Sequence, residues 1–450
     1  MKIKQVVVLA GQAKEASSIL PGLEQLGLQI SDRLSIDGNG SESLLICRSG
    51  FEDTPSGSAL IRQALGEGCS ILLDGGNCSS ALDEIKQTGG LCQETRDDLA
   101  AHALYKCLES DAQRLAALQS KTGGMPRYLV AAFEKVQDLR YGENWHQNAA
   151  LYRKKDGLGL HRAQKLNGRE MSYNNVVDAE TVLEMLIDLS SYDGVEVKKP
   201  LSVIVKHANP CGVAYDSTLA EAYRLSFATD PKSAFGGVIG FNRPVDVDLA
   251  CAIGDSFVEV LLAPGFDPEA LRLLTEKKPN RRILDIGDLL ERSEELYRGY
   301  YLRNIFGGMM LQDYDTGDLK EWKTVTARHP TESETKALRF AWKIAKYVKS
   351  NALVYTTENQ TVGIGSGQVS RVDSARFGAE KAGEHGLCTA GTVAATDSFF
   401  PFRDGLDETF KAGATAVIHP GGSIRDEEVI DAANEHGMAM VFTGMRHFRH

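Results

Sequence analysis

Residues 203–214 read VIVKHANPCGVA, an apolar run that leads directly into lysine, histidine and a turn containing proline. The β-branched residues at 203–205 predict a strand buried on both faces. Strand patterns of this kind alternate with helical patterns along the chain, so we expect an α/β fold. Ligands of open α/β sheets collect outside the carboxyl ends of the strands, and this rule places Lys206 and His207 in a candidate site.

The chemistry of this pair depends on the backbone around it. Successive strand residues face opposite sides, so Lys206 and His207 approach one reacting centre only if the chain leaves strand geometry there. Asn209 and Pro210 are expected to end the strand, because proline cannot donate to a ladder. A charged lysine disfavours imidazolium and keeps the histidine ring neutral, the form that accepts a proton. The alternative is an exposed lysine beside a hydrogen-bonded histidine with no catalytic role.

Zinc is not expected at this motif. Zinc-dependent nucleobase deaminases carry H-x-E followed by P-C-x-x-C. Residues 207–214 here read HANPCGVA, without the glutamate and without the second cysteine. The 8 cysteines of the chain form no C-x-x-C pair, so neither structural zinc nor a disulfide framework is expected. We expect reduced thiols that behave as small apolar side chains.

The composition fits a soluble globular chain with two or three domains: 450 residues, of which 42% are hydrophobic and 25% charged. The formal net charge of −11 gives no general attraction for nucleic acid or for an anionic membrane, so an anionic ligand requires a local basic pocket. The sequence has no apolar run of about 18 residues and no signal-peptide pattern at its start. We therefore expect a cytoplasmic protein.

The glycine- and proline-containing segment 120–126 follows a long helical pattern and predicts a domain boundary near residue 122. Residues 1–122 are expected to form a small α/β domain with parallel strands at VVVLA, SLLIC and SILLD. Residues 123–450 continue the α/β pattern and are long enough for two subdomains. Their strand candidates are LSVIVK, ALVYTT, TVGIG, ATAVI and MAMVF.

One helix is predicted over residues 334–349, and its last turn is basic, which suits the negative end of a helix. Its apolar stripe, at three- and four-residue spacing, consists of Leu338, Ala341, Ile344, Ala345 and Val348. Downstream, TVGIGSGQVSRVDSAR at 361–376 predicts a strand, a glycine turn and a helix that starts near Ser370 and Asp373. The N–H groups of such a helix start suit an anion, although the stretch matches neither dinucleotide-binding nor phosphate-loop patterns.

Two further stretches suit a polar ligand. Residues 139–152, LRYGENWHQNAALY, interleave Arg140 and Tyr141 with glycine and amides, as a phosphate or planar polar ligand requires. Residues 443–450, TGMRHFRH, read either as a solvated basic tail or as a docked segment, because they directly follow MAMVF and contain the apolar Phe448.

Ten stretches, in order from about residue 139 to 450, carry a family resemblance. They are LRYGENWHQ, LNGREMSYNNVVDAE, VIVKHANPCGVA, AFGGVIGFNRPVD, IFGGMM, YVKSNALVY, TVGIGSGQVSRVDSAR, SFFPFRDG, HPGGSIRDEEVI and VFTGMRHFRH. Together they resemble the AICAR transformylase half of the bifunctional AICAR transformylase/IMP cyclohydrolase family of purine biosynthesis. The resemblance implies transfer of a formyl group from 10-formyltetrahydrofolate to the 5-amino group of AICAR, which gives FAICAR and tetrahydrofolate on the way to IMP.

The resemblance also implies an architecture and site residues. The architecture is two cytidine deaminase-like α/β/α subdomains without zinc, in a homodimer whose sites draw on both subunits, with a structural monovalent cation whose ligands we do not assign. The family's lysine-histidine pair falls on Lys206, which stabilises charge on the formyl oxygen, and His207, which takes the amine proton. Asn351, in the matching KSN, holds the reacting groups in register. AICAR is expected to contact Arg140, Tyr141, His207, Gly236, Glu259, Asn351, Arg371, Phe399 and Arg446, with Asn175 as a secondary candidate. Folate is expected to contact Val372, Asp404, Ser423 and Ile424.

The sequence departs from the family in two places. Trp145 stands where the family usually has proline, so either the backbone is less stiff there or the indole packs as an aromatic wall. The cyclohydrolase half normally carries serine-threonine-glycine-glycine-threonine, lysine-threonine-leucine-histidine-proline and aspartate-isoleucine-glycine-glycine segments, and none is present here. Residues 72–104 resemble only the end of that half. We predict a shortened N-terminal domain without cyclohydrolase activity that supports packing and the dimer.

Two alternatives to a monofunctional transformylase stay open at the level of sequence. One is a catalytically silent purine-nucleotide-binding or regulatory paralogue that kept the pocket. The other is the full bifunctional enzyme with a divergent cyclohydrolase site.

Overall fold

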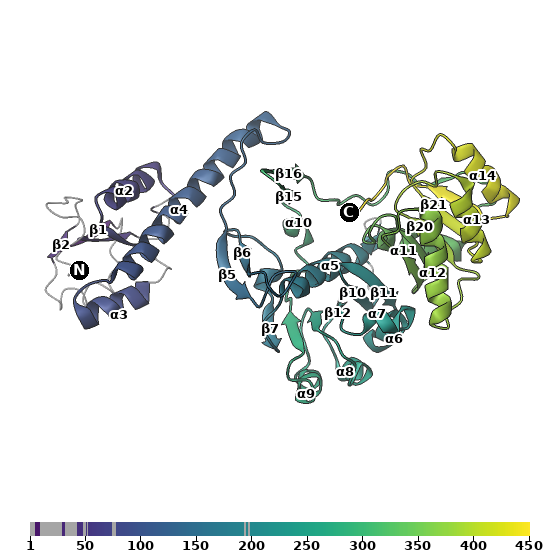
Figure 1. The fold of residues 1–450 in the computed structure, drawn as a ribbon, viewed down its shortest axis with the longest axis horizontal. Coiled ribbons are helices and arrows are strands. Elements are labelled where there is room, and N and C mark those ends of the chain that lie inside the picture. Colours follow the sequence, from purple (N-terminus) through teal and green to yellow (C-terminus); the bar gives the residue numbers. More distant parts are fainter. Residues whose placement is uncertain are drawn as a thin grey trace. The chain divides into compact units, whose positions relative to one another are not determined.

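The structure is a computed structural model of the 450-residue chain, and it describes residues 5–9, 29–31, 43–47, 51, 53–73, 78–192, 195–196 and 199–450. Contacts divide the chain into two compact units (Figure 1). The first unit comprises Met1–Glu134 with Arg153–Asp156, and the second comprises Lys135–Tyr152 with Gly157–His450. No helix of the described residues has the length and apolar character needed to cross a membrane.

The first unit contains a four-stranded sheet with the order β2-β1-β3-β4. All three pairings are parallel, as predicted for this region. The strands are β1 (Gln5–Leu9), β2 (Gln29–Ser31), β3 (Ser43–Cys47) and β4 (Ser70–Leu73). The helices are α2 (Pro55–Gly66), α3 (Cys78–Thr88), α4 (Gln93–Gln119) and the short η3 (Ser120–Thr122).

The second unit is built around two six-stranded sheets, which lie between helices (Figure 1). The first has the order β11-β10-β12-β13-β14-β7. Its strands are β7 (Gln164–Asn167), β10 (Leu201–Lys206), β11 (Asn209–Tyr215), β12 (Val238–Phe241), β13 (Val260–Ala263) and β14 (Arg282–Asp285). The second sheet has the order β17-β22-β21-β20-β18-β19. Its strands are β17 (Lys323–Thr324), β18 (Leu353–Thr356), β19 (Thr361–Gly365), β20 (Val393–Thr396), β21 (Ala416–His419) and β22 (Ala439–Phe442).

The two sheets share one topology, which makes this unit a structural duplication. In each, a hairpin (β10–β11 or β18–β19) joins three parallel strands (β12–β14 or β20–β22), and a short antiparallel strand closes the far edge. The helices of the first half are α5 (Tyr173–Leu189), α6 (Leu219–Thr229), α8 (Val247–Ile253) and α9 (Pro268–Glu276). Those of the second half are α11 (Glu332–Ala345), α12 (Arg371–Glu384), α13 (Arg403–Lys411) and α14 (Asp426–Glu435). The sequence analysis expected two subdomains, and the family resemblance implied that both have the same kind of fold.

Both halves use strand glycines for close helix packing. A Cβ on Gly212 of β11 would lie 1.8 Å from the carbonyl oxygen of Ser226 in α6. A Cβ on Gly363 of β19 would lie 2.2 Å from the carbonyl oxygen of Gly378 in α12. Each helix can therefore rest on its hairpin only because these strand positions carry no side chain.

The two halves meet along their hairpin edges. Residues 214 and 360 form an antiparallel bridge, and the backbone N–H of Tyr215 donates to the carbonyl of Asn359 at 2.9 Å. The hydroxyl of Thr361 accepts from the backbone N–H of Val213 at 2.9 Å. Since β11 and β19 run antiparallel here, strands β12–β14 and β20–β22 point in opposite directions. The amino edge of β12–β14 and the carboxyl edge of β20–β22 therefore lie on the same side of the unit.

Smaller elements connect these parts. They are β5 (Glu134–Leu139), β6 (Ala149–Arg153), η4 (Leu160–Arg162), β8 (Ser191–Tyr192), β9 (Val195–Glu196), α7 (Pro231–Ala234), α10 (Ser293–Leu296), β15 (Tyr301–Ile305) and β16 (Gly308–Gln312).

Most predicted elements of the second unit are confirmed, with shifted ends. LSVIVK and TVGIG match β10 and β19 residue for residue. The helix predicted over 334–349 is α11, which begins two residues earlier and ends at Ala345, and its apolar stripe is buried as predicted. Its start is set by a capping box between Thr331 and Glu334. The lysines at the end of this helix do more than complement the helix dipole. Lys343 and Lys346 form ion pairs with Asp188 of α5 at 2.7 and 3.0 Å.

Candidate active site

The turn between β10 and β11 carries the lysine-histidine pair. Lys206 pairs with Asn209, so His207 and Ala208 form a two-residue hairpin loop with φ values of 54° and 56°. Left-handed conformation at both positions is the geometry of a type I′ turn, which normally selects asparagine and glycine. The backbone therefore leaves strand geometry at His207, as joint action of the pair requires. His207 is exposed, and Lys206 donates from Nζ to the carbonyl of Phe235 at 2.7 Å.

Two expectations about this stretch are wrong. Asn209 and Pro210 do not end a strand; they are the first two residues of β11. Pro210 pairs with Val205 next to a register shift, an irregularity at which proline is tolerated in a sheet. The pair also does not lie at the carboxyl ends of parallel strands. Because β10 runs antiparallel to β12, the end of β10 lies at the amino edge of β12–β14.

Asp178 of α5 supports the turn from below. Its Oδ1 accepts the backbone N–H of Ala208 at 2.7 Å. Burial raises the pKa of Asp178 above its ordinary value, although backbone hydrogen bonds from Ala208 and His207 and the charge of Lys349 act in the opposite direction. The Asp178 carboxylate thus holds His207 and Ala208 in a left-handed backbone conformation that neither residue favours.

Two other predicted residues of the first half lie along the same amino edge. Gly236 and Glu259 come just before β12 and β13, and the N–H of Glu259 donates to the carbonyl of Gly237 at 3.0 Å. Gly236 has a φ of 73°, and its N–H donates to the carbonyl of Phe257 at 2.8 Å. Burial raises the pKa of the Cys211 thiol, nearby in β11, to about 12, so this thiol is protonated at neutral pH.

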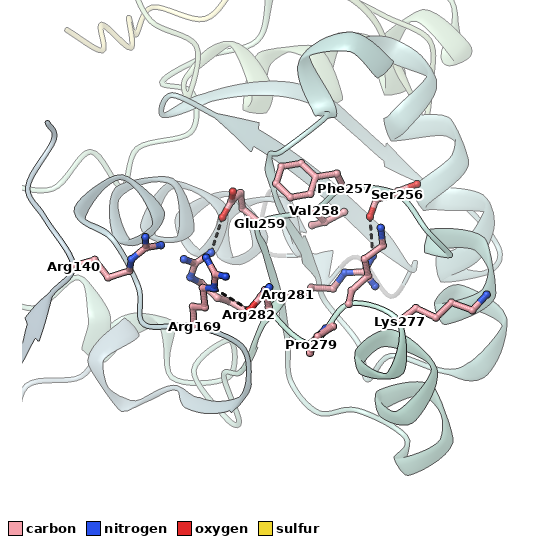
Figure 2. Close-up of a pocket in the computed structure, with 12 residues that line it drawn as sticks. Arg140, Arg169, Ser256, Phe257, Val258, Glu259, Lys277, Pro279, Arg281 and Arg282 are labelled. Atoms are coloured by element: carbon pink, nitrogen blue, oxygen red, sulfur yellow. Dashed lines mark hydrogen bonds and ion pairs between the residues drawn. The ribbon is translucent and has the colours of Figure 1, made fainter. Parts of the chain in front are cut away.

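A basic pocket of about 380 Å³ opens at this edge (Figure 2). Arg140 and Glu259, both predicted, line it together with Arg169, Lys277, Lys278, Arg281 and Arg282. Glu259 is held by Arg282 at 2.5 Å, and the Arg282 side chain is only 5% exposed. The excess of guanidinium and ammonium groups suits a phosphate, which arginine binds with two parallel hydrogen bonds.

The predicted segment around Arg140 is in part structural. The Arg140 guanidinium lies 5.4 Å from the centre of the Tyr141 ring. Trp145 is 89% exposed, so its indole does not pack against the rest of this chain. Asn175 is 8% exposed and serves in the capping box of α5, where its Oδ1 accepts the N–H of Ser172 at 3.2 Å.

The second half contributes a group centred on Arg371. This arginine is the first residue of α12, after the N-cap Ser370, and it is 7% exposed. It donates to the Asn351 side-chain oxygen at 3.0 Å and to Asp397, which is fully buried, at 2.6 Å. Asn351 and Arg371, both site candidates from the sequence, are therefore in contact, and Asp397, which the sequence analysis did not name, orients the guanidinium.

The remaining predicted contacts lie at the carboxyl edge of β20–β22. Phe399, half-buried, follows β20, and Ser423, Ile424 and Arg446 follow β21 and β22. Val372 and Asp404 occupy the first turns of α12 and α13. These turns lie together, since a Cβ on Gly405 would be 3.8 Å from the Val372 nitrogen. Ile424 and Asp404 are exposed.

The C-terminal stretch is a docked segment and not a solvated tail. His447 is buried, and its Nδ1 donates to the Asp315 carboxylate at 2.7 Å. Its backbone N–H donates to the Asp397 carbonyl at 3.0 Å. Arg449 bonds Glu184 at 2.9 Å, and its carbonyl accepts the N–H of Ser350 at 3.0 Å. Arg446 stays exposed with its guanidinium 4.6 Å from the Phe448 ring centre.

One hydrogen bond joins the two groups. The Oδ1 of Asn209, directly after the turn, accepts the backbone N–H of Lys349 at 2.9 Å. Lys349 stands two residues before Asn351. This hydrogen bond therefore links the turn that carries Lys206 and His207 to the segment that carries Asn351. The site residues of both halves thus face the same side of this unit.

Three supporting residues escaped the sequence analysis. Asp178 and Asp397 are buried carboxylates. Asp178 lies within the quoted stretch LNGREMSYNNVVDAE, whereas Asp397 directly precedes the stretch SFFPFRDG. His419, at the end of β21, is buried between the Phe400 and Phe442 rings. Burial, with a contribution from Arg371, lowers the pKa of His419 to about 3, so its ring is neutral.

Comparisons with known proteins agree on one relationship. The family model described as AICARFT/IMPCHase bienzyme matches residues 67–381. A protein of Persephonella marina named bifunctional purine biosynthesis protein PurH is 46% identical over 387 residues, which is 85% of this chain and 73% of the relative. Proteins with the same name from Acidithiobacillus ferrooxidans and Myxococcus xanthus are 45% and 43% identical, with the same coverage.

Proposed function

This chain belongs to the AICARFT/IMPCHase bienzyme family, and from that premise we propose that it transfers a formyl group from 10-formyltetrahydrofolate to the 5-amino group of AICAR. The observation that supports this assignment best is the left-handed turn of His207, which is fastened through Asn209 to the segment of Asn351. A silent paralogue would have no need to keep a strained turn with a proton acceptor on it.

His207 is proposed as the general base. The 5-amino group of AICAR is a weak nucleophile, because its lone pair is delocalised into the imidazole ring. An exposed imidazole at the tip of a fixed turn can take the amine proton as the C–N bond to the formyl carbon forms. A positioned general base contributes about 10²- to 10⁴-fold to the rate of such a step.

Lys206 is proposed to stabilise the negative charge that develops on the formyl oxygen. Its ammonium has three donors, and the Phe235 carbonyl, 2.7 Å away, uses one of them. This bond aims the ammonium along the amino edge of the sheet and leaves donors for the substrate. Loss of a preorganised donor of this kind costs about 3 kcal/mol of transition-state stabilisation.

The two substrates are proposed to enter from different halves. The phosphate of AICAR fits the basic pocket around Arg140, whereas Asn351 and Arg371 hold the imidazole end. The folate is expected along Val372 and Asp404, with Ser423 and Ile424 at the rim. Phe399 and Arg446 complete the AICAR site, and a homodimer is proposed to bring subunits together around it.

The first unit is proposed to have no cyclohydrolase activity. In support, the family match begins at residue 67, and the segments named above for the cyclohydrolase half are missing from the sequence. We also propose that residues 1–122 act as a separate domain that supports packing and assembly of residues 123–450.

A single assay tests these proposals. Purified protein is incubated with AICAR and 10-formyltetrahydrofolate, and tetrahydrofolate and IMP are followed. We expect tetrahydrofolate without IMP. Absence of tetrahydrofolate would indicate a silent paralogue, and IMP without added cyclohydrolase would contradict the monofunctional assignment.

Variants at His207 test the mechanism. His207→Ala is expected nearly to abolish turnover while AICAR still binds. His207→Asn is the sharper variant, because asparagine tolerates the left-handed backbone but has no basic nitrogen. Wild-type turnover in either variant would show that another group takes the proton.

A further inference from the structure

The C-terminal segment 446–449 alternates between exposed and buried side chains. Arg446 and Phe448 are exposed, whereas His447 is 2% exposed and Arg449 is half-buried. Such alternation is typical of an extended chain that turns one face inward. The segment therefore has an anchored face and an outer face, and Arg446, a candidate AICAR contact, lies on the outer face.

The His447 ring holds this segment through both of its nitrogens. Nδ1 lies 2.7 Å from a carboxylate oxygen of Asp315, and Nε2 lies 3.0 Å from the carbonyl oxygen of Asp318. A carbonyl oxygen can only accept a hydrogen bond, so Nε2 carries a proton. The Trp342 ring covers the imidazole, with 5.0 Å between the ring centres, and its Nε1 donates to the same Asp318 carbonyl at 2.6 Å.

The Asp315 carboxylate makes the other ring nitrogen a donor as well. Burial acts to raise the pKa of Asp315, but the hydrogen bond and charge of His447, together with the charge of Lys346, hold this pKa below its ordinary value. An ionised carboxylate only accepts hydrogen bonds, so Nδ1 also carries a proton and the ring is an imidazolium. Hydrogen bonds between charged groups are stronger than those between neutral groups. His447 is therefore held by an ion pair on one side and by a backbone carbonyl on the other.

The backbone of His447 places the segment beside the group centred on Arg371. The His447 N–H donates to the Asp397 carbonyl at 3.0 Å, and the Asp397 carboxylate accepts from Arg371 at 2.6 Å. Arg446, the residue before His447, therefore leaves the chain close to Arg371, which is itself a candidate AICAR contact.

A second anchor lies two residues further along the chain. Arg449 donates to Glu184 of α5 at 2.9 Å, and its carbonyl accepts the N–H of Ser350 at 3.0 Å. Ser350 directly precedes Asn351. These bonds do not involve the His447 ring, so the segment keeps one anchor when the His447 side chain is replaced.

The charge of Arg446 is available to a ligand. Its guanidinium lies 4.6 Å from the Phe448 ring centre, and no carboxylate among the described residues pairs with it. Just before it, the carbonyl of Met445 accepts from the Thr443 hydroxyl at 2.8 Å. Arg446 thus lies between two fixed residues, and an unpaired guanidinium at a fixed place suits an anionic group, which arginine binds with two parallel hydrogen bonds.

We propose that His447 is a positioning residue for AICAR binding: its imidazolium, held by Asp315, fixes the place from which Arg446 reaches the nucleotide. His447 itself contacts no substrate, because its ring is enclosed below Trp342. The proposal rests on the proposed function, since AICAR is the ligand, and it adds a pair of residues, His447 and Asp315, that the proposed reaction does not use.

Calorimetric titration of the full chain with AICAR, in the absence of folate, tests this proposal. His447→Gln removes the imidazolium but keeps an amide donor, and Asp315→Asn removes the charge of its partner. The Asp315 side chain is 48% exposed, so loss of the ion pair leaves no fully buried carboxylate unpaired. The matched controls are His329→Gln and Asp313→Asn, at exposed positions outside the segment.

We expect His447→Gln to bind AICAR at least about tenfold more weakly than wild type and Asp315→Asn at least about threefold more weakly, with both controls unchanged. In an Arg446→Ala background, His447→Gln is expected to weaken binding by less than about twofold, because the residue that it positions is gone. In the formyl-transfer assay, KM for AICAR should rise while KM for 10-formyltetrahydrofolate changes by less than about twofold.

Wild-type AICAR affinity in His447→Gln would overturn the proposal. Equal losses from this substitution with and without Arg446 would overturn it too, because a general loss of structure gives that result. If the thermal midpoint shows that His447→Gln is unfolded, Asp315→Asn is judged by the same two criteria. The titration needs no turnover, so a wild-type protein that binds AICAR but releases no tetrahydrofolate would contradict the proposed formyl transfer and leave the test of His447 valid.

Discussion

Asp178→Ala is predicted to slow formyl transfer, although Asp178 is not expected to contact a substrate. Asp178 fixes the turn of His207 through a 2.7 Å bond to the Ala208 N–H. A hydrogen bond with a charged partner contributes about 1.5–3 kcal/mol. The two left-handed residues that it holds cost about 1–3 kcal/mol each, so without the carboxylate the turn relaxes. If that energy is lost from the competent conformation, kcat falls about 10- to 100-fold.

The assay separates positioning from folding and from binding. We expect kcat to fall while KM for AICAR and the thermal midpoint change little, because the phosphate pocket and the sheets remain. Asp178→Asn keeps an oxygen acceptor without the charge and should lie between wild type and Asp178→Ala.

The matched rescue is Ala208→Gly in the Asp178→Ala background, because glycine adopts the left-handed conformation without strain. It is expected to restore a large part of kcat. Wild-type kcat in Asp178→Ala, or a loss that Ala208→Gly does not reduce, would refute the proposed role of the turn.

Three further predictions concern stability. Arg371→Ala leaves Asp397 buried without its cation and should lower the free energy of unfolding by about 3–5 kcal/mol, measured by urea titration; an unchanged midpoint would contradict this. The neutral His419 stabilises the fold above its unfolded pKa near 6.5, and this contribution is lost as the pH falls toward its folded pKa of about 3. His419→Phe should therefore remove about 2 kcal/mol of the pH dependence between about pH 6.5 and 4.5, and identical pH profiles would contradict the assignment. Gly212→Ala places a Cβ 1.8 Å from the Ser226 carbonyl oxygen and should lower the thermal midpoint by several degrees, whereas Gly383→Ala, where a Cβ meets no atom within 4 Å, should not.

Part of this protein was determined by its sequence alone. Runs of β-branched residues predict buried strands, and this local signal does not depend on which strands pair with each other. LSVIVK and TVGIG were therefore predicted residue for residue. The apolar stripe of α11 and the N-cap at Ser370 are equally local signals. The candidate site residues came from long stretches that resemble a family. Such stretches can be compared before any fold is known, because the comparison needs only the identities of the side chains.

Strand direction and the supports of the site were decided only by the tertiary structure. Whether Lys206 ends a strand at the carboxyl or the amino edge depends on the pairing of β10 with β12, which residues far apart in sequence determine. The hydrogen bond between Asn209 and Lys349, and the carboxylate of Asp178 under the turn, exist only once the halves and α5 are packed. The family resemblance implied two subdomains of one kind, but their shared strand order is seen only in the structure, because many different side chains are compatible with the same backbone hydrogen bonds.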